Sequence, residues 1–156
     1  MSRTIHSLLA EPFHRFVSRD PQETREWGQQ FARHLVAGDV VCLYGELGAG
    51  KTCLTQGIVA GLGVGARVPV RSPSFTFVRE YRGRERILHW DLYRLRSSEE
   101  VEELGWRESF DGNAIVLIEW ADRVSSLLPQ RRWDITLTMI SENIRHLEAR
   151  RFQAAP

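Results

Sequence analysis

The chain has 156 residues, of which 42% are hydrophobic and 26% are charged. These proportions are typical of one folded domain and exclude a disordered or fibrous chain. The 21 basic and 20 acidic residues leave a net charge of +1, which excludes a nucleic-acid-binding field spread over the whole surface. The longest apolar runs, 40–44 and 114–118, are far shorter than the roughly 20 residues that cross a bilayer. The apolar patch 8–10 is too short for a secretory signal, so we expect a cytoplasmic protein.

The elements of the first half can be predicted from capping residues and apolar spacing. The sequence DPQE at 20–23 offers a capping acid, a proline at the first helical position and a glutamate three residues after the cap. Large apolar side chains follow at 27, 31 and 35, which predicts a helix over 21–37 that ends at Gly38. The continuous apolar run 40–44 predicts a strand covered on both faces. A glycine-rich turn and a second helix from Lys51 to Gly63 complete this unit.

The second half indicates a mixed sheet. Alternation over 75–81, a turn at 82–84 and the run 87–91 predict an antiparallel hairpin. A helix over 97–105 and a second buried strand over 114–118 come next. The strictly alternating stretch 133–139 and a segment over 144–149 predict the last strands. We therefore predict an α/β fold, a three-layer sandwich with a mixed, mostly parallel sheet. Residues 18–150 form its single domain, 1–17 an N-terminal extension and 151–156 a tail.

The octapeptide GELGAGKT at 45–52 matches the phosphate-binding P-loop, with a predicted strand before it and a helix after it. In such a loop, backbone N–H groups and the helix N-terminus bind phosphates, and the lysine reaches the outer phosphates. Lys51 is the single lysine among the 21 basic residues, which fits a position where a compact ammonium is required. Thr52 would place a hydroxyl on Mg²⁺. With this loop between a strand and a helix, the predicted fold is P-loop NTPase-like. The predicted nucleotide-binding residues here are Gly45, Glu46, Leu47, Gly48, Ala49, Gly50, Lys51, Thr52 and Cys53.

Two acids end predicted strands, where ligands of open α/β sheets bind. Glu119 follows the apolar run 114–118 and is similar to the acid that serves Mg²⁺ in P-loop proteins; the alternative is a solvated surface carboxylate. Asp91 ends 87–90 and could orient or deprotonate the attacking water; the alternative is a turn acid paired with Arg94. The hydroxyl-rich loop 72–76 could sense the γ-phosphate or simply lead into a strand. We expect His89 to serve packing or to face solvent.

Motifs that are absent from the sequence limit which nucleotide base the chain could recognise. The guanine-reading NKxD or TKxD pattern is impossible, because Lys51 already lies in the P-loop. No aspartate has glycine three residues later, so the GTPase motif DxxG is also absent from the sequence. ATP is therefore the expected nucleotide. The two cysteines, Cys42 and Cys53, lack metal-ligand spacing and are expected to be reduced.

Four motifs together resemble the TsaE family, a group of small bacterial P-loop ATPases required for threonylcarbamoyladenosine in tRNA. They are GELGAGKT at 45–52, SPSF at 72–75, HWDLYR at 89–94 and IEWAD at 118–122. Their order and spacing match the family over residues 18 to about 149.

The resemblance implies a role for each matching residue. It places Lys51 on the phosphates, Thr52 and Glu119 on Mg²⁺, and makes Asp91 essential for hydrolysis. It puts Trp120 beside the nucleotide and Thr24 and Arg145 near the adenine pocket. Three places depart from the usual family sequence: Ser74 stands for threonine, Cys53 stands for a second threonine, and the segment 143–145 reads Asn-Ile-Arg where a glycine commonly precedes the arginine.

The resemblance also implies that the chain uses ATP and Mg²⁺ as cofactors and acts on the TsaB–TsaD complex. It implies that the chain meets tRNA only through that complex, does not contact a membrane, and is a monomer when free. Whether the chain holds ATP or ADP would control its docking onto the complex. One alternative is a small-molecule P-loop kinase, in which Arg82, Arg84 and Arg86 could imitate a lid. Another is a nucleotide-gated binding module with negligible turnover.

Overall fold

A computed structural model of the chain describes residues 13–152. Among these residues, no helix has both the length and the apolar character needed to cross a membrane. The elements, in chain order, are β1 (Phe13–Ser18), α2 (Pro21–Ala32), β2 (Val40–Tyr44), α3 (Lys51–Gly61), β3 (Val78–Arg82), β4 (Arg86–Asp91), α4 (Glu99–Glu103), η1 (Arg107–Phe110), β5 (Ile115–Glu119), η2 (Ala121–Leu127), β6 (Arg132–Met139) and β7 (Arg145–Phe152).

The strands form one mixed sheet in the order β1-β7-β6-β2-β5-β4-β3. β2 runs parallel to both β5 and β6, and β4 runs parallel to β5. The pairs β1–β7, β6–β7 and β3–β4 are antiparallel. The predicted α/β class and mixed sheet are confirmed, although parallel and antiparallel pairings of the described strands are equal in number. The parallel pairs occupy the centre, so the carboxyl ends of β2, β4 and β5 meet at one rim.

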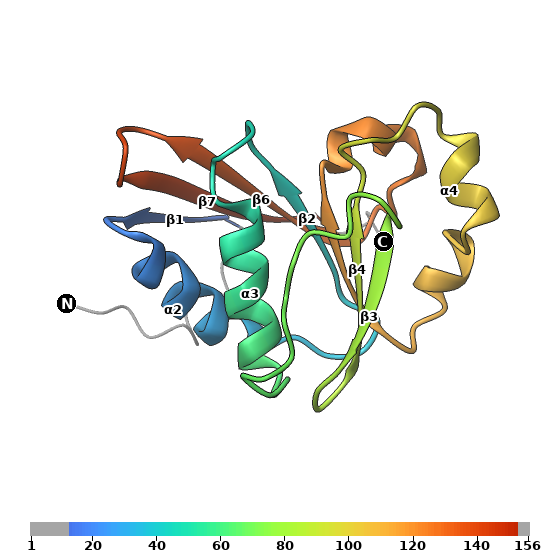
Figure 1. Ribbon diagram of the computed structural model, residues 1–156, viewed down its shortest axis with the longest axis horizontal. Coiled ribbons are helices and arrows are strands. Elements are labelled where there is room, and N and C mark those ends of the chain that lie inside the picture. Colours follow the sequence, from blue (N-terminus) through green and yellow to red (C-terminus); the bar gives the residue numbers. More distant parts are fainter. Residues whose placement is uncertain (1–12, 153–156) are drawn as a thin grey trace.

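Helices cover both faces of the sheet, as the three-layer prediction requires (Figure 1). On one face α2 and α3 pack over a core that includes Phe31, Leu54 and Leu117. On the other face α4, η1 and η2 cover a second core that includes Trp90, Trp106 and Ile118. The apolar run of β5 serves both cores with alternate side chains, which explains why it is continuously hydrophobic.

Glycines let α2 and α3 approach closely. An added Cβ at Gly57 would lie 2.3 Å from the carbonyl oxygen of Arg25, and one at Gly61 would lie 2.4 Å from that of Gln29. Both distances are shorter than any real side chain tolerates against backbone, so the contact between the two helices requires glycine. Because α3 begins at Lys51, this packing also fixes the direction of the helix that carries the P-loop.

Gly57→Ala should therefore lower the free energy of unfolding by about 1–3 kcal/mol, the usual cost of forcing extra volume into a packed contact. Gly65→Ala is the matched control, because an added Cβ there meets no atom within 4 Å. Urea unfolding of the two variants measures the difference. Equal midpoints would contradict a packing role for Gly57.

Several boundaries differ from those predicted. The first helix ends at Ala32, because the amides of Arg33, His34 and Leu35 bond to carbonyls three residues back and tighten the last turn. The predicted helix over 97–105 is shorter, with α4 spanning Glu99–Glu103. The hairpin strand begins at Val78 instead of 75, since the Thr76 and Phe77 amides both bond to the Pro73 carbonyl in a turn.

The assignment of the chain ends also changes. Residues 13–17, predicted as part of an N-terminal extension, belong to β1, which pairs with β7 at the edge of the sheet. Residues 151–152, predicted as tail, belong to β7. The rest of both predicted segments, 1–12 and 153–156, lies outside the described residues.

Candidate functional site

The P-loop joins β2 to α3, as predicted. Gly45, Gly48 and Gly50 have φ values of 154°, 83° and 105°, a region that side-chain-bearing residues rarely adopt. An added Cβ at Gly45 would also lie 2.7 Å from the carbonyl oxygen of Leu137 on β6. Gly45 is therefore required by both its backbone conformation and the space around it. The loop places the N-terminus of α3, with its free amides, at the rim.

Lys51 lies inside this loop. Its Nζ donates hydrogen bonds to the carbonyl oxygens of Gly45 and Glu46, and it lies 4.0 Å from the centre of the Trp120 ring. Burial lowers the pKa of the Lys51 ammonium, while the nearby carboxylates of Glu119 and Asp91 act in the opposite direction. The ammonium is therefore placed among groups of opposite charge at the rim.

The two predicted acids come together beside the lysine. Asp91 ends β4 and Glu119 ends β5, and the two residues are direct partners in the parallel register. Both are buried, with 3% and 1% of their surfaces exposed. The Thr52 hydroxyl donates to Glu119 Oε1 over 2.9 Å. The alternative of a solvated surface carboxylate at Glu119 is therefore wrong.

Asp91 is held by short-range hydrogen bonds. It accepts from the Ser72 hydroxyl and, over 3.0 Å, from the Tyr93 amide. Arg94 instead stacks on the Phe75 ring, 4.3 Å from its centre, so the alternative of an Asp91–Arg94 pair is not what forms. Burial, with a smaller contribution from the Glu119 charge, raises the pKa of Asp91 above its ordinary value. A carboxyl with this shift accepts a proton more readily than an exposed aspartate.

This shift gives a pH prediction for any reaction in which Asp91 takes up a proton. As the pH falls, Asp91 becomes protonated at a higher pH than an ordinary aspartate of pKa 3.8, and the rate should fall with it. Asp91→Asn should remove this acidic limb from the profile of its residual activity. The profile of turnover number against pH, restricted to the range in which circular dichroism shows a folded chain, checks the expectation. An unchanged limb in Asp91→Asn would assign it to another group.

A cavity of about 360 Å³ opens among these groups. It brings together the P-loop, the loop between α3 and β3, and residues at and just after the ends of β4 and β5. Its lining residues are Leu47, Gly48, Gly50, Lys51, Thr52, Cys53, Ser72, Ser74, Asp91, Tyr93, Arg94, Glu119 and Trp120. The predicted phosphate, metal and water-activating residues thus share one cavity. Three further residues of the predicted set, Gly45, Glu46 and Ala49, shape the loop without lining the cavity.

Arg145 lies next to the P-loop and Thr24 at the junction of β1 and α2, and neither lines this cavity. Arg145 Nη2 lies 3.4 Å from the Gly48 carbonyl oxygen, to which it donates a hydrogen bond. The Thr24 hydroxyl lies 2.7 Å from that of Ser18, at the junction of β1 and α2. Cys53 ties the start of α2 to α3 by donating to the Pro21 carbonyl over 3.2 Å. Contact of Thr24 and Arg145 with an adenine ring stays a prediction.

Sequence reasoning missed His89 and Tyr93. His89 is fully buried and lies 2.5 Å from Glu119 Oε2 through its Nε2, a role beyond packing or solvent exposure. Tyr93 lines the cavity and lies against Trp120, with ring centres 5.0 Å apart. The period of two along a strand places residues 89 and 91 on one face, and this signal identifies His89 as a neighbour of Asp91.

The oxygens at the rim fit a magnesium ion. Thr52 Oγ1 and Glu119 Oε1 lie close enough to share one ion, and oxygen is the ligand that Mg²⁺ prefers. In the described part of the chain, no group of three or more His, Cys, Asp or Glu side chains could hold a metal. The donor set therefore suits an ion that takes its other ligands from phosphates and water.

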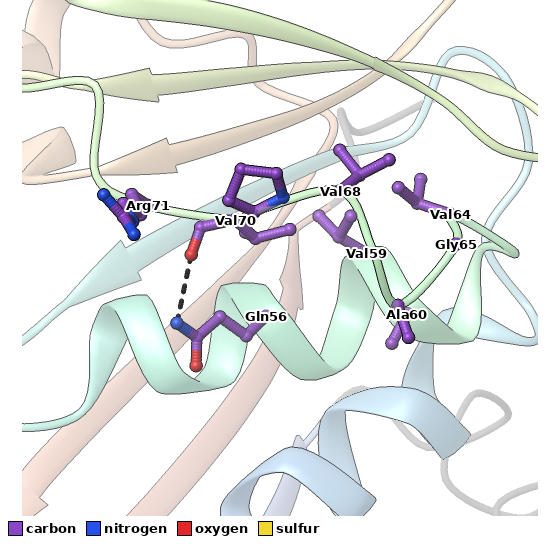
Figure 2. Close-up of a pocket in the computed structure, with 10 residues that line it drawn as sticks. Gln56, Val59, Ala60, Val64, Gly65, Val68, Val70 and Arg71 are labelled. Atoms are coloured by element: carbon purple, nitrogen blue, oxygen red, sulfur yellow. Dashed lines mark hydrogen bonds between the residues drawn. The ribbon is translucent and has the colours of Figure 1, made fainter.

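A second cavity, also of about 360 Å³, lies between α3 and the segment 64–71 (Figure 2). Valine side chains dominate its lining, with Arg71 as the charged exception. The Gln56 amide donates to the Val70 carbonyl over 3.0 Å, so α3 anchors the chain just before Ser72. This cavity has no carboxylate and no part of the P-loop, so its lining does not suit a magnesium-bound phosphate.

Known proteins are similar to this chain over most of its length. A family described as "Threonylcarbamoyl adenosine biosynthesis protein TsaE" matches residues 18–148. The tRNA threonylcarbamoyladenosine biosynthesis protein TsaE of Treponema pallidum is 40% identical over 133 residues, which are 85% of this chain and 97% of that protein. The protein of the same name from Bacillus subtilis is 39% identical over 129 residues, 82% of this chain and 79% of that one.

A solved structure shows the same fold. The crystal structure of YdiB from Bacillus subtilis superposes with a TM-score of 0.78 and 32% sequence identity, covering 90% of this chain and 86% of that one. The family match over residues 18–148 contains the P-loop, both acids and the strands that carry them. The chain therefore belongs to the TsaE family of tRNA threonylcarbamoyladenosine biosynthesis proteins.

Proposed function

We propose that this chain is the ATP-binding and ATP-hydrolysing component of the machinery that makes threonylcarbamoyladenosine in tRNA. One observation carries the proposal: Lys51, Thr52, Asp91 and Glu119 line a single cavity at the carboxyl ends of the parallel strands. A phosphate-binding loop, a two-oxygen cation site and a buried carboxylate are the parts that phosphoryl transfer to water needs.

In the proposed reaction the P-loop amides and the Lys51 ammonium bind the β- and γ-phosphates. Lys51 exchanges its hydrogen bonds with Gly45 and Glu46 for bonds to phosphate oxygens. Thr52 and Glu119 would hold Mg²⁺, which when bound neutralises charge on the phosphates. Asp91 accepts the proton of the attacking water, and its raised pKa suits that task. Trp120, already beside the Lys51 ammonium, borders the nucleotide.

The partner of this reaction is proposed to be the TsaB–TsaD complex, with tRNA engaged only through it. Two apolar side chains of the cavity lining are exposed, Leu47 by 69% and Tyr93 by 39%, and Phe75 in the adjoining loop is exposed by 80%. Apolar surface around a ligand cavity favours a protein partner that docks where it senses the nucleotide. The net charge of +1 supplies little general attraction for tRNA.

The arginines that could imitate the lid of a kinase lie away from the cavity. The arginine-bearing turn between β3 and β4 lies at the start of β4, whereas Asp91 and the cavity lie at its end. At about 3.3 Å per residue, the length of β4 separates Arg86 from Asp91 by roughly 16 Å. Arg84 also donates to the Ala32 carbonyl of α2, which directs it away from the phosphates.

Product analysis tests the proposed activity. The purified chain with ATP and Mg²⁺, alone and with TsaB–TsaD, should release free phosphate into water. Phosphate on an added nucleoside or metabolite would support a kinase, and ATP binding without any product would support a nucleotide-gated binding module. The partner is tested separately by size-exclusion chromatography with TsaB–TsaD: co-elution in ATP is expected, and failure to associate in any nucleotide state would remove the partner proposal.

A further inference from the structure

His89 is a buried polar side chain that the proposed reaction does not use. It lies on β4 two residues before Asp91, on the sheet face covered by α2 and α3. None of its surface is exposed, and the side-chain surface of Glu119 beside it is 2% exposed. Its Nε2 lies 2.5 Å from Glu119 Oε2. An ionised carboxylate can only accept a hydrogen bond, so the imidazole carries a proton on Nε2 and donates it.

The other ring nitrogen makes the position unusual for a packing residue. Within the described residues, His89 Nδ1 is buried and has no hydrogen-bond partner. The neighbours of His89 along the strand and across the register, Ile87 and Leu117, are apolar core residues. A phenylalanine or leucine would fill such a site without leaving an unpaired polar atom, so the bond to Glu119 is the feature that needs a histidine.

The two oxygens of Glu119 have different partners. Oε1 accepts from the Thr52 hydroxyl, and Oε2 accepts from His89. A cation held between Thr52 Oγ1 and Glu119 Oε1 displaces the bond between those two oxygens, because the hydroxyl must turn its lone pair to the metal. The His89 bond lies on the far oxygen and is compatible with that cation. It would then be the bond that fixes the carboxylate.

From this geometry we infer that His89 is a positioning residue for the magnesium site: it orients Glu119 so that Oε1 faces Thr52 and the P-loop. The inference rests on the proposed binding of a magnesium nucleotide. Hydrogen-bond partners that orient a metal ligand typically change metal affinity by about 10- to 100-fold when they are removed. His89 acts through Glu119 and does not itself touch the nucleotide.

A matched pair of variants tests the inference. His89→Gln can place an amide N–H near the position of Nε2, whereas the shorter amide of His89→Asn reaches only the region of Nδ1. The affinity of ADP is measured by calorimetry in EDTA and over a range of Mg²⁺ concentrations, with thermal unfolding as the check on folding. We expect unchanged ADP affinity in EDTA for both variants. The Mg²⁺ concentration that produces half of the change in ADP affinity should rise about 10- to 100-fold in His89→Asn. It should stay near the wild-type value in His89→Gln.

His89→Leu, which keeps the site packed and removes both nitrogens, should behave like His89→Asn. If folded His89→Asn and His89→Leu both keep the wild-type Mg²⁺ dependence, the inference is wrong and the proposed function stands. Equal loss of ADP affinity in EDTA and in Mg²⁺ would also overturn it, because the role would then be structural. If the wild-type chain binds ADP with no effect of Mg²⁺, the proposed magnesium site fails and the inference falls with it.

Discussion

Asp91→Asn should abolish most ATP hydrolysis while nucleotide binding persists. Removing a group that accepts the proton of the attacking water typically slows a reaction by about 100- to 10,000-fold. The asparagine carbonyl oxygen keeps the acceptor for the Tyr93 amide, and the Ser72 hydroxyl can turn to accept from the asparagine NH2, so the local structure should survive. Phosphate release gives the rate, and calorimetry with ADP and Mg²⁺ gives the affinity. Asp91→Ala should show the same separation of hydrolysis from binding.

Stability provides an independent check on this variant. Because burial raises the pKa of Asp91 in the folded chain, ionising it costs folding free energy near neutral pH. Asp91→Asn removes that cost and should unfold at a temperature no lower than the wild type. Asp111→Asn, the same chemical change at an exposed site, is the control and should leave hydrolysis intact. Normal hydrolysis by Asp91→Asn would show that the proposed role of this carboxylate is wrong.

Lys51→Ala should weaken both binding and hydrolysis. Hydrogen bonds to charged groups contribute about 1.5–3 kcal/mol, so ATP affinity should fall roughly 10- to 100-fold. The rate should fall further, because charge on the transferring phosphoryl group loses a donor. Titration of the nucleotide followed by calorimetry, together with phosphate release at saturating ATP, separates the two effects.

Lys51→Arg tests whether this position needs the compact shape of an ammonium group or only a positive charge. Lys51 is 5% exposed and packed between two loop carbonyls and the Trp120 ring, which leaves little room for a planar guanidinium. The arginine variant should therefore fail almost as badly as alanine, although the other 20 basic residues of the chain are arginine. Near-normal activity in Lys51→Arg would show that a positive charge suffices at this position.

The parts of the site that depend on local sequence were predictable. The P-loop needs glycine where the backbone adopts positive φ, and Gly45, Gly48 and Gly50 do so. Asp91 and Glu119 were placed by the rule that ligands bind beyond the carboxyl ends of parallel strands. Their direct pairing across β4 and β5 agrees with that rule.

Features that depend on distant parts of the chain were not predictable. β1 was missed because its partner, β7, lies at the other end of the sequence, and six residues carry little signal alone. The contact of His89 with Glu119 depends on the register between β4 and β5, which alternation along one strand does not fix. The loop at 72–77 looked like a strand entry because the turn around Pro73 has an alternating apolar pattern.

A structure of the chain with Mg²⁺ and a non-hydrolysable ATP analogue would show whether the nucleotide binds among these residues. We predict phosphates in the P-loop beside Lys51, a cation about 2.0–2.1 Å from the Thr52 hydroxyl oxygen or joined to it and Glu119 through water, and the Asp91 carboxylate facing the γ-phosphate. A nucleotide bound elsewhere, such as in the cavity between α3 and 64–71, or an Asp91 carboxylate turned away from the γ-phosphate, would contradict the account.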